Sequence, residues 1–527
     1  MNLAQFFEHW AIVENPFRGE EARTDAIFAR IGIAGGSADS ENAGPGRVRL
    51  VRPNMPATHA EFDKIVGEFD HPSTSIVFGE KGSGKTAIRL QIADHIARYN
   101  GDNPGRRVLL IPYDDLNSSL DGYVRAAGTA KKDDPFAGVR LVDHIDAIVS
   151  IGVGRIVNAL LVGSESPPPA QIEDASKRAR KMPISVRRDL LLLQAVYDTS
   201  DSTGARTVAL KRLLRLGGSG PRALIATGVW IGWIPAAALF VWGQFFGGFG
   251  DSVRTALLIG SVALLACWLF LLLKLTLIDR VLDRHIAQRV GKQLRLVPRS
   301  PAGLVASLGK LERSIASPET LPVSGSEETR YALLARLQRV SNELGFRTIL
   351  VLMDRVDEPT LIRGDPERMR SLVWPMLSHK FLQHDGMAIK MLLPIELRHA
   401  LFKESSSFFQ EARLDKQNLV ERLSWTGAML YDLCNTRLAT CRPVSAESIS
   451  LVDLFAEEVT RQDLVEALDH MQQPRDAFKF VYRCLTEHCA SVTDEEGAWR
   501  IPKHTLDTVR KAEAERVMGL QRGIRPA

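Results

Sequence analysis

The stretch from Ser75 to Tyr99 reads SIVFGEKGSGKTAIRLQIADHIARY, and it decides the fold class of the chain. Residues Ser75 to Phe78 are typical of a short buried strand. Residues Ala87 to Tyr99 carry apolar side chains at helical spacing, which predicts a helix. Between them lies a segment that fits the pattern G-x-x-x-x-G-K-[ST] at every fixed position. A strand, this loop and a helix in that order predict an α/β fold, in which a P-loop NTPase core is built on a parallel sheet.

The loop has the composition that a phosphate-binding site needs. Its glycines allow the backbone to curl, so that successive N–H groups face phosphate oxygens. The N-terminus of the following helix adds a partial positive charge. We expect Lys85 to reach the β- and γ-phosphates of a nucleotide and the Thr86 hydroxyl to bind Mg²⁺. The predicted nucleotide-binding residues are Gly79, Glu80, Lys81, Gly82, Ser83, Gly84, Lys85 and Thr86.

A second magnesium contact is expected at the tip of a neighbouring strand. The run Thr348 to Met353 is continuously apolar, as a central parallel strand should be, and Asp354 follows it directly. We predict that Asp354 binds the metal directly or through water. Arg355 occupies the next position, where a carboxylate that orients the attacking water is usual in such ATPases. Either Asp357 or Glu358 must then serve as the catalytic base, or hydrolysis is weak.

Two further strands are predicted at Arg107 to Ile111 and Ala388 to Pro394. The second of these follows the Asp354 strand after one helical crossover, predicted over Pro366 to Phe381. This is the position of a strand that carries a polar sensor of the γ-phosphate. Glu396 or Arg398 are the candidates, and the alternative is that both are ordinary surface charges at a strand end.

The composition describes a globular chain of more than one folding unit. The chain has 527 residues, of which 45% are apolar and 24% charged, which excludes wholesale disorder. The net charge of +5 is small for this length and does not by itself indicate nucleic acid binding. The five cysteines show no C-x-x-C spacing, so we expect reduced, mostly buried thiols. A zinc site at Cys484, His488 and Cys489 is less favoured than a buried helix face.

Two uncharged runs predict a pair of transmembrane helices. The first is residues 223–246, ALIATGVWIGWIPAAALFVWGQFF, and the second is residues 255–278, with Lys274 as its only charge. Twenty-four helical residues reach about 36 Å, enough for a hydrocarbon core of about 30 Å. The short connection makes the pair a tight hairpin with both ends on one side. The alternative is a buried helical pair in a large soluble core.

Charge predicts the orientation of this hairpin. Basic residues crowd both outer flanks, whereas the connection has only Arg254, which Asp251 balances. The positive-inside rule then places both flanks and both termini in the cytoplasm. We therefore predict a multi-pass protein of the cell (inner or plasma) membrane. The flanking cations are Arg206, Lys211, Arg212, Arg215 and Arg222 before the pair, and Lys274, Arg280, Arg284, Arg289, Lys292 and Arg295 after it.

The remaining pattern is mainly helical. Leu141 to Leu161 is apolar and long, but four ionisable residues interrupt it (Asp143, His144, Asp146 and Arg155), so we predict a core helix rather than a membrane span. Other predicted helices include 304–315, 331–344, 463–471, one opening at Pro474, and 501–519. The predicted organisation is an N-terminal segment and linker (1–46), the first part of the core with a helical insert (47–200), the hairpin with stalk helices (201–300), the second part of the core (301–415) and a helical lid (416–527).

This order of features resembles the membrane-interrupted P-loop ATPases of the KAP type, within the AAA+/STAND group. The GEKGSGKT loop, the DRVDE tip and the position of the hairpin carry the resemblance. It implies ATP as the nucleotide, Mg²⁺ as the cofactor and work in signalling or defence at a membrane. The segment QPRD at 473–476 is similar to the sensor-2 helix start of AAA+ lids, which implies that Arg475 touches the γ-phosphate. Arg355 departs from the family, which usually has a second acid there.

Three functions compete. The first is a membrane-anchored ATPase that acts as an ATP- and Mg²⁺-dependent conformational switch, as a homo-oligomer or with a protein partner. The second is a nucleotide-binding scaffold with little hydrolysis, which Arg355 favours. The third is a DNA-linked AAA+ ATPase, which the resemblance to origin-recognition-type lids and the basic C-terminal segment after Arg500 favour. Nucleic acid is nevertheless not the favoured partner, because acidic residues alternate with the cations of that segment. A transporter is disfavoured because the hairpin has no charge within the membrane. The sequence does not exclude a pore formed by several assembled hairpins.

Overall fold

The computed structural model describes residues 1–18, 21–32, 50–51, 57–127, 135–162, 172, 174–216, 229, 231–246, 250–312, 315–492 and 498–521. The predicted linker at 35–46 and the first part of the first predicted span lie outside these residues. The chain divides into two compact units. The first unit comprises Met1–Asn103, Leu350–Arg370 and Leu377–Ala527, and the second comprises Pro104–Ile349 and Ser371–Met376.

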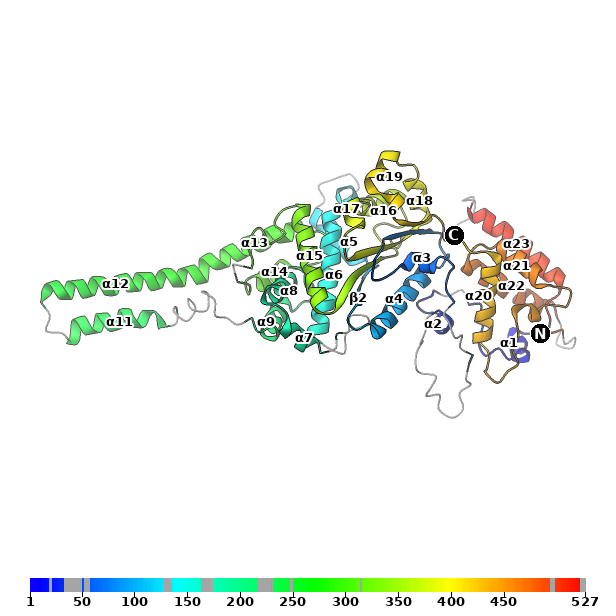
Figure 1. Ribbon diagram of the computed structural model, residues 1–527, viewed down its shortest axis with the longest axis horizontal. Coiled ribbons are helices and arrows are strands. Elements are labelled where there is room, and N and C mark those ends of the chain that lie inside the picture. The colour runs from blue at the N-terminus through cyan, green and yellow to red at the C-terminus, as the bar shows by residue number, and fades with distance from the viewer. Residues whose placement is uncertain are drawn as a thin grey trace. The chain divides into compact units, whose positions relative to one another are not determined.

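Five strands form one parallel sheet, surrounded by helices, in the order β2-β3-β4-β1-β5 (Figure 1). An α/β fold with a parallel sheet is therefore confirmed. In the register of β1 and β4, Ser75 lies opposite Lys390 and Gly79 opposite Pro394, so both carboxyl ends reach the same edge. The strands are β1 (Ser75–Gly79), β2 (Arg107–Tyr113), β3 (Phe346–Met353), β4 (Met387–Pro394) and β5 (Asn418–Val420).

The helices of the first unit either follow strands in the sequence or lie in its N-terminal and C-terminal segments. They are α1 (Leu3–His9), α2 (Ala26–Ile31), α3 (Phe62–Val66), α4 (Lys85–Asp102), α17 (His379–Leu382), α18 (Ile395–Leu401), α19 (Ser406–Ala412), η7 (Leu414–Lys416), α20 (Gly427–Thr440), η8 (Leu451–Leu454), α21 (Arg461–Asp469), α22 (Pro474–Ser491) and α23 (Lys503–Gln521). The helix α16 (Pro366–Val373) begins in this unit and ends in the other.

The second unit is almost entirely helical. Its elements besides β2 and the start of β3 are α5 (Asn117–Ala127), η2 (Pro135–Gly138), α6 (Leu141–Leu161), α7 (Ala175–Lys181), α8 (Ile184–Tyr197), α9 (Thr203–Leu213), α11 (Trp233–Val241), η4 (Trp242–Phe246), α12 (Asp251–Leu273), η5 (Lys274–Ile278), α13 (Asp279–Gln293), α14 (Pro301–Leu308), α15 (Glu327–Glu343) and η6 (Trp374–Met376). Of these, α6 packs against α8 and α15 and is mostly buried, as expected for a core helix.

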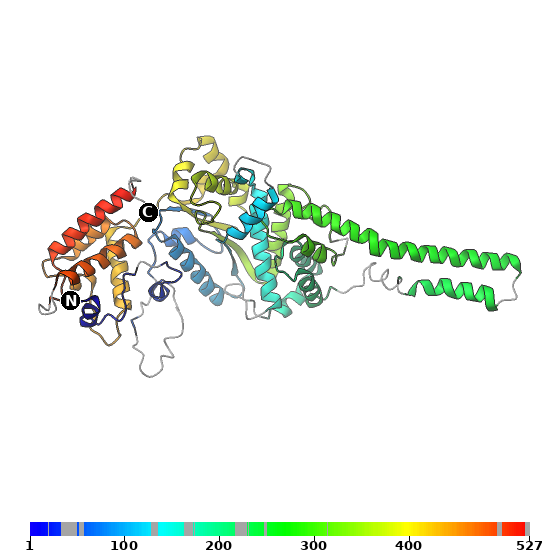
Figure 2. The same cartoon turned by 180° about the vertical axis from the view of Figure 1, so that it is seen from behind.

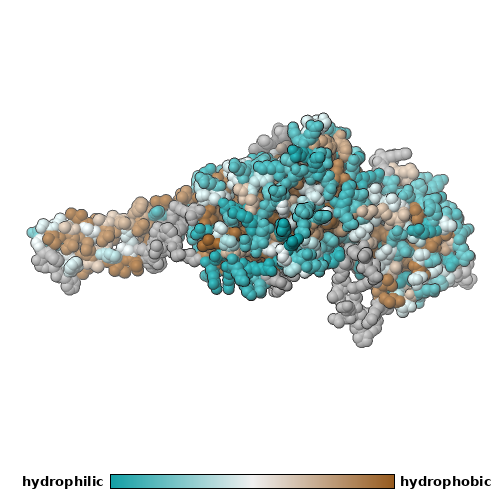
Figure 3. All heavy atoms as spheres, in the orientation of Figure 1, coloured by the Kyte–Doolittle hydropathy of each residue, from teal (hydrophilic) through white to brown (hydrophobic). Residues whose placement is uncertain are grey.

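The helices α11 and α12 run side by side as a hairpin (Figures 1 and 2). Their exposed surface is strongly apolar (Figure 3). In the described part of the chain, α6 and α12 are long and apolar enough to cross a membrane, and only α12 leaves its apolar residues exposed. Small residues allow the two helices to approach, because a Cβ on Gly260 would lie 3.2 Å from the Leu239 side chain. The helix α12 begins at Asp251, earlier than the predicted span, because an acid is favourable in a first turn.

Three helices differ from their predicted bounds for local reasons. The crossover predicted over 366–381 is broken into α16, η6 and α17, because Pro375 lacks the N–H that a continuous helix needs. The helix α14 ends at Leu308, well before residue 315, and Gly309 follows it. The sequence predicts a helical segment from Glu20 to Ile31, but α2 begins only at Ala26, because the Asp25 side chain accepts hydrogen bonds from the N–H groups of Ile27 and Phe28.

The C-terminal helices form a core together with the N-terminal segment. Side chains from α1, α2, α20, α21, α22 and α23 share one hydrophobic cluster. The start of α20 approaches α21 so closely that a Cβ on Gly427 would collide with the carbonyl oxygen of Val465. The Gly427 N–H also donates to the Asp469 side chain over 2.9 Å. Glycine is therefore required where these two helices meet.

We expect Gly427→Ala to destabilise the protein by about 1–3 kcal/mol, because the new methyl group must displace helix α21. Gly101→Ala is the matched control, since no atom lies within 4 Å of the added Cβ and alanine favours a helix. The thermal unfolding midpoint of the purified chain in neutral detergent measures both. Equal midpoints for the two variants would contradict this account.

A lysine is buried in the middle of the sheet. The Lys390 ammonium on β4 donates to the Ser73 carbonyl over 2.6 Å and to the Ser75 hydroxyl over 3.1 Å, and no acidic partner accompanies it among the described residues. Burial lowers the pKa of Lys390 to about 7, because the charged form loses its hydration. Near neutral pH, the Lys390 side chain of the folded protein is therefore charged in some molecules and neutral in others.

Stability should depend on pH through this lysine. The ordinary pKa is 10.5, so between about 7 and that value the unfolded chain binds a proton that the folded chain has released. Stability then rises as the pH increases through this window. We expect the unfolding midpoint of the wild type to rise relative to that of Lys390→Met as the pH increases from about 7 to about 9. A difference that stays constant over this range would mean that Lys390 keeps its charge when folded.

Candidate functional site

The glycine-rich loop after β1 has the curled backbone that a phosphate-binding loop needs. Gly82 and Gly84 adopt left-handed conformations with φ of 99° and 96°, which favour glycine. The Lys85 ammonium lies across the loop and donates to the carbonyls of Gly79, over 2.7 Å, and Glu80, over 2.9 Å. The buried Ser83 hydroxyl has no hydrogen-bond partner among the described residues. Backbone N–H groups, an ammonium and this hydroxyl thus gather at the N-terminus of α4.

The magnesium ligands predicted from sequence lie next to each other. The Thr86 hydroxyl is 3.4 Å from the Asp354 carboxylate, although the two residues are 268 positions apart. Asp354 follows the end of β3 and is 1% exposed. Arg89, one turn further along α4, places its Nε 3.3 Å from the same carboxylate. Sequence reasoning missed Arg89, because its only signal is its position three residues after Thr86 on one helix face.

Burial changes the proton affinities of the two central charges. It raises the pKa of Asp354, because the carboxylate loses hydration, while the nearby Arg89 guanidinium acts in the opposite direction. Burial also lowers the pKa of Lys85, and the negative charge of Asp357 is the largest effect opposing it. For both groups the loss of hydration is the larger effect, and the opposite charges of the neighbours offset it only in part.

The residue after Asp354 has an unusual conformation. Arg355 has a φ of 62°, a left-handed backbone that is strained for a side chain of this size. Its guanidinium lies 3.3 Å from Glu358 and 3.5 Å from Glu21. Burial raises the pKa of Glu358, and the Arg355 charge opposes this rise. Asp357 and Glu358 both line the pocket described below, so the structure keeps both as candidate bases.

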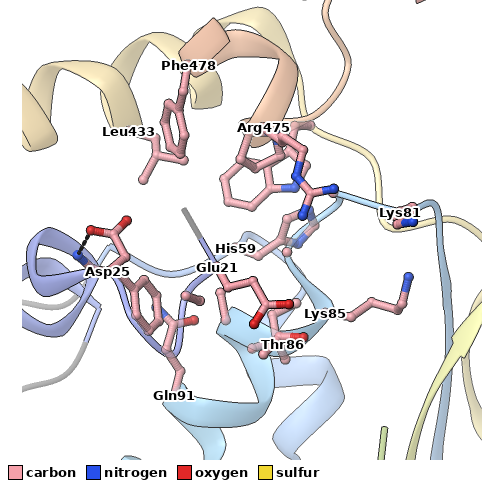
Figure 4. A pocket seen from close by; sticks show the side chains of 18 of the residues that line it. Glu21, Asp25, His59, Lys81, Lys85, Thr86, Gln91, Leu433, Arg475 and Phe478 are labelled. Carbon is pink, nitrogen blue, oxygen red and sulfur yellow. Dashed lines mark hydrogen bonds between the residues drawn. The ribbon is translucent and has the colours of Figure 1, made fainter. Parts of the chain in front are cut away.

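The start of helix α22 lies against the loop. A Cβ on Gly82 would meet the Arg475 side chain at 3.2 Å, so any larger residue in the loop would press on α22. Arg475 lines the pocket, and within the described residues its guanidinium makes no hydrogen bond or ion pair. Figure 4 shows Arg475 on the wall opposite Lys85 and Thr86. It is therefore available to an anionic ligand.

Other C-terminal residues hold the loop directly. The Trp425 indole N–H donates to the Ser83 carbonyl over 2.8 Å. Arg422 pairs with Glu80 over 2.7 Å, and the Gln473 side-chain amide donates to the same carboxylate. Glu80 is a variable position in the loop pattern, so sequence reasoning gave it only a place in the loop. Its carboxylate binds Arg422 and Gln473 and so ties the loop to two C-terminal segments.

These residues surround a cavity of about 330 Å³ within the first unit. The loop, the tip of β3 and Arg475 form its polar side, with Glu21 reaching in from the N-terminal segment (Figure 4). The other side is apolar and lies between α2, α20 and α22. Its apolar lining residues are Phe28, Ile31, Leu433 and Phe478. A ligand with a charged end and a flat apolar end matches this division.

A buried ion pair closes the apolar side. Arg437 of α20 lies 2.7 Å from Asp25, and its Nε donates to the Pro16 carbonyl over 2.6 Å. The guanidinium also lies over the Phe478 ring, 4.5 Å from its centroid. Asp25 and Arg437 are 412 positions apart, and nothing in the sequence pattern connects them. They join the N-terminal segment to the C-terminal helices at the wall of the pocket.

The structure brings most of the predicted site residues to one cavity, although Gly79, Glu80 and Ser83 do not line it. The predicted residues Lys81, Lys85, Thr86, Asp354, Asp357, Glu358 and Arg475 all line the one cavity. Glu396 and Arg398 do not line it. The Arg398 guanidinium instead lies 2.7 Å from Glu421 and over the Phe402 ring. The missed lining residues Glu21, Asp25, His59, Trp425 and Arg437 come from segments with no catalytic motif.

The described residues contain no group of three or more His, Cys, Asp or Glu side chains that could hold a metal ion. Cys484 and Cys489 are buried in the C-terminal core, and the His488 ring nitrogen bonds to the Ala498 carbonyl. A metal in the pocket would therefore need ligands beyond Thr86 and Asp354, such as phosphate oxygens.

No protein-family model, curated protein or solved structure matches the chain.

We expect Arg437→Met to destabilise the protein by about 3–5 kcal/mol, because the buried Asp25 carboxylate then loses the positive charge that balances it. The double variant Asp25→Asn, Arg437→Met should recover part of this loss, since no charge remains unpaired. Chemical unfolding in neutral detergent is measured for the wild type, both single variants and the double variant. If the double variant were as unstable as the sum of both single variants, the pair would contribute nothing beyond its separate side chains.

Proposed function

We propose that this chain is a membrane-anchored P-loop ATPase in which Mg²⁺ and ATP bind the cavity of the first unit. The observation that carries the proposal is the approach of Thr86 to Asp354, 3.4 Å apart across 268 positions of sequence, beside Lys85. A hydroxyl at a loop–helix junction and a carboxylate at the tip of a neighbouring strand are the pair that such enzymes need. The resemblance to KAP-type ATPases agrees with this reading.

In this proposal the polar side of the cavity holds the triphosphate. The loop N–H groups, the Ser83 hydroxyl and Lys85 bind the β- and γ-phosphates. Arg475 has no partner among the described residues, so it can bind the γ-phosphate and sense its loss. The purine lies among Phe28, Ile31, Leu433 and Phe478 on the apolar side. ATP is proposed over GTP, because the sequence has no N-K-x-D motif to read guanine.

Thr86 and Asp354 would hold Mg²⁺, and their oxygens fit its preference for hard ligands with phosphate and water completing the shell. The bound ion would neutralise charge on the phosphates. The charge of Arg89 favours the ionised form of Asp354 and so opposes the effect of burial on its pKa. Asp357 or Glu358 would accept the proton of the attacking water. Arg355 lies 3.3 Å from Glu358 and so positions that carboxylate while reducing its basicity.

The hairpin of α11 and α12 is the proposed membrane anchor. The apolar surface of α12 suits a bilayer, and cations occupy the flanks of the pair. In this proposal both flanks and both termini face the cytoplasm of a cell membrane. Nucleotide binding would then act as a conformational switch at the membrane, with a second copy or a protein partner as the receiver.

A scaffold that binds nucleotide and scarcely hydrolyses it is the second candidate. The favouring observation is Arg355, which stands where a catalytic acid is usual and is paired with both Glu21 and Glu358.

A DNA-linked ATPase is less favoured. On α23, Arg510 pairs with Asp507, and Arg516 with Asp476 and Glu513, so these cations are neutralised within the protein. Arg522 and Arg525 lie outside the described residues.

The test is nucleotide turnover by the full-length chain in neutral detergent. Lys85→Ala and Asp354→Asn should each lower Mg²⁺-dependent ATP turnover by about 100-fold or more, because each removes charge stabilisation at the phosphates. Lys403→Ala is the control, since Lys403 is exposed and lies outside the pocket. Turnover that survives both site variants would overturn the proposal.

Two further variants separate the candidate bases and the two candidate functions. Glu358→Gln or Asp357→Asn should lower turnover by about 100-fold or more while ATP still binds, and the affected variant identifies the base. If the wild type binds ATP tightly without turnover, the scaffold is the correct function. If it binds no ATP at all, both candidates fail.

A further inference from the structure

A run of cations in the second unit has no part in the proposed nucleotide site. Residues 177–188 read KRARKMPISVRR, with six basic residues and no acidic one. They cover the end of α7 and the first turn of α8. A stretch with this charge raises the local positive potential and so attracts anionic partners.

Few internal partners neutralise this run. Lys177, Arg180, Lys181 and Arg188 are exposed, whereas Ala179, Met182 and Val186 between them are buried and anchor both helices. Among the described residues, Arg180, Lys181 and Arg188 have no ion pair or hydrogen bond. Lys177 has only Asp174, over 3.5 Å and in solvent.

The adjacent acid is already occupied. Asp189 of α8 is buried and pairs with Arg336 over 2.6 Å and with Arg339 over 3.0 Å, both on α15. It therefore cannot compensate the exposed cations. Ile184 lies within the same run and is 54% exposed, so an apolar side chain faces solvent amid the charges.

These cations lie beside the point where the chain leaves for the hairpin. Arg187 donates to the carbonyl of Leu214 over 2.9 Å, which joins the start of α8 to the end of α9. The end of α9 adds the exposed Arg212 and Arg215. In the sequence, α9 is the last described helix before the α11–α12 hairpin. The helices α7 and α8 both pack against α9, so the exposed cations of these three segments form a basic surface in the part of the chain that precedes the hairpin.

We propose that this surface binds the headgroups of anionic phospholipids. The basic surface consists of Lys177, Arg180, Lys181, Arg188, Arg212 and Arg215. Each cation near an anionic bilayer surface strengthens binding by about fivefold, so several together hold a helix at the headgroups. Ile184 enters the interface between the charges, as apolar residues of membrane-surface helices do.

The chemistry favours lipid over nucleic acid. The run 177–188 contains no aromatic residue on which a base could stack. An exposed isoleucine between cations suits a headgroup–acyl boundary and has no use at a phosphate backbone. The chain also enters the hairpin directly after this surface, so anionic lipid is the polyanion present at high local concentration. The inference rests on the hairpin being embedded in a membrane, and it is independent of nucleotide binding.

The test uses the full-length chain in lipid discs of phosphatidylcholine alone or with about 30% phosphatidylglycerol, read by amide hydrogen exchange. We expect amides of residues 175–190 to exchange in the anionic discs at about one fifth of their rate in the neutral discs, or less. Salt near 1 M should abolish this difference. The variant Lys177→Gln, Arg180→Gln, Lys181→Gln, Arg188→Gln should exchange equally in both discs. The control variant Lys416→Gln, Arg461→Gln, Lys479→Gln, Arg500→Gln removes four exposed cations of the other unit and should keep the difference.

Three outcomes would overturn the inference. Equal exchange of the wild type in both discs would show that the surface ignores lipid charge. Greater protection of residues 175–190 by an RNA or DNA 20-mer in neutral discs than by phosphatidylglycerol would identify nucleic acid as the partner. If the chain failed to enter the discs, the premise that the hairpin is embedded in a membrane would be wrong. ATP turnover in detergent tests the nucleotide site separately, so the two failures can be distinguished.

Discussion

The buried charge of Asp354 is the constraint on which the candidate site depends. A carboxylate that is 1% exposed is stable only with partners, and α4 supplies two, the Thr86 hydroxyl at 3.4 Å and the Arg89 guanidinium at 3.3 Å. These two residues are three positions apart, so they lie on one face of the helix. The rotation of α4 about its axis is thereby set relative to the tip of β3. The same helix N-terminus carries Lys85, so the partners of one buried acid also orient the phosphate-binding loop.

The loop is held on its other side by the C-terminal helices. Glu80, Ser83 and Gly82 contact Arg422, Trp425 and the start of α22, and Arg475 extends from α22 into the cavity. In the proposed ATPase, a change in the phosphates would alter the contacts of Arg475 and so bias the position of these helices. The Asp25–Arg437 pair makes the N-terminal segment part of the same assembly. The switch would thus act through contacts that border the nucleotide on three sides.

How far the sequence could predict this structure varies from element to element. The strands β1 to β4 and the helix α6 were found because apolar runs and helical periodicity are local properties. The crossover before β4 was predicted as one helix, since its periodicity persists through Pro375, yet the missing N–H breaks it. The loop residues and Asp354 were found because their chemistry requires particular residue types at fixed spacing. Glu21, Asp25 and Arg437 were missed, because each belongs to the site only through a distant partner.

The sequence by itself determined the glycine-rich loop between strand and helix, the apolar strands, the apolar hairpin and the cationic runs around it, because each depends on residues close together in the chain. Only the tertiary structure decided that Thr86 meets Asp354 across 268 positions and that Arg437 meets Asp25 across 412. It also decided that Arg355 takes a left-handed backbone and pairs with Glu21 and Glu358, and that Glu80 faces Arg422. Such contacts follow from how helices pack on a sheet, and burial then selects which charges must pair. No local pattern carries that information.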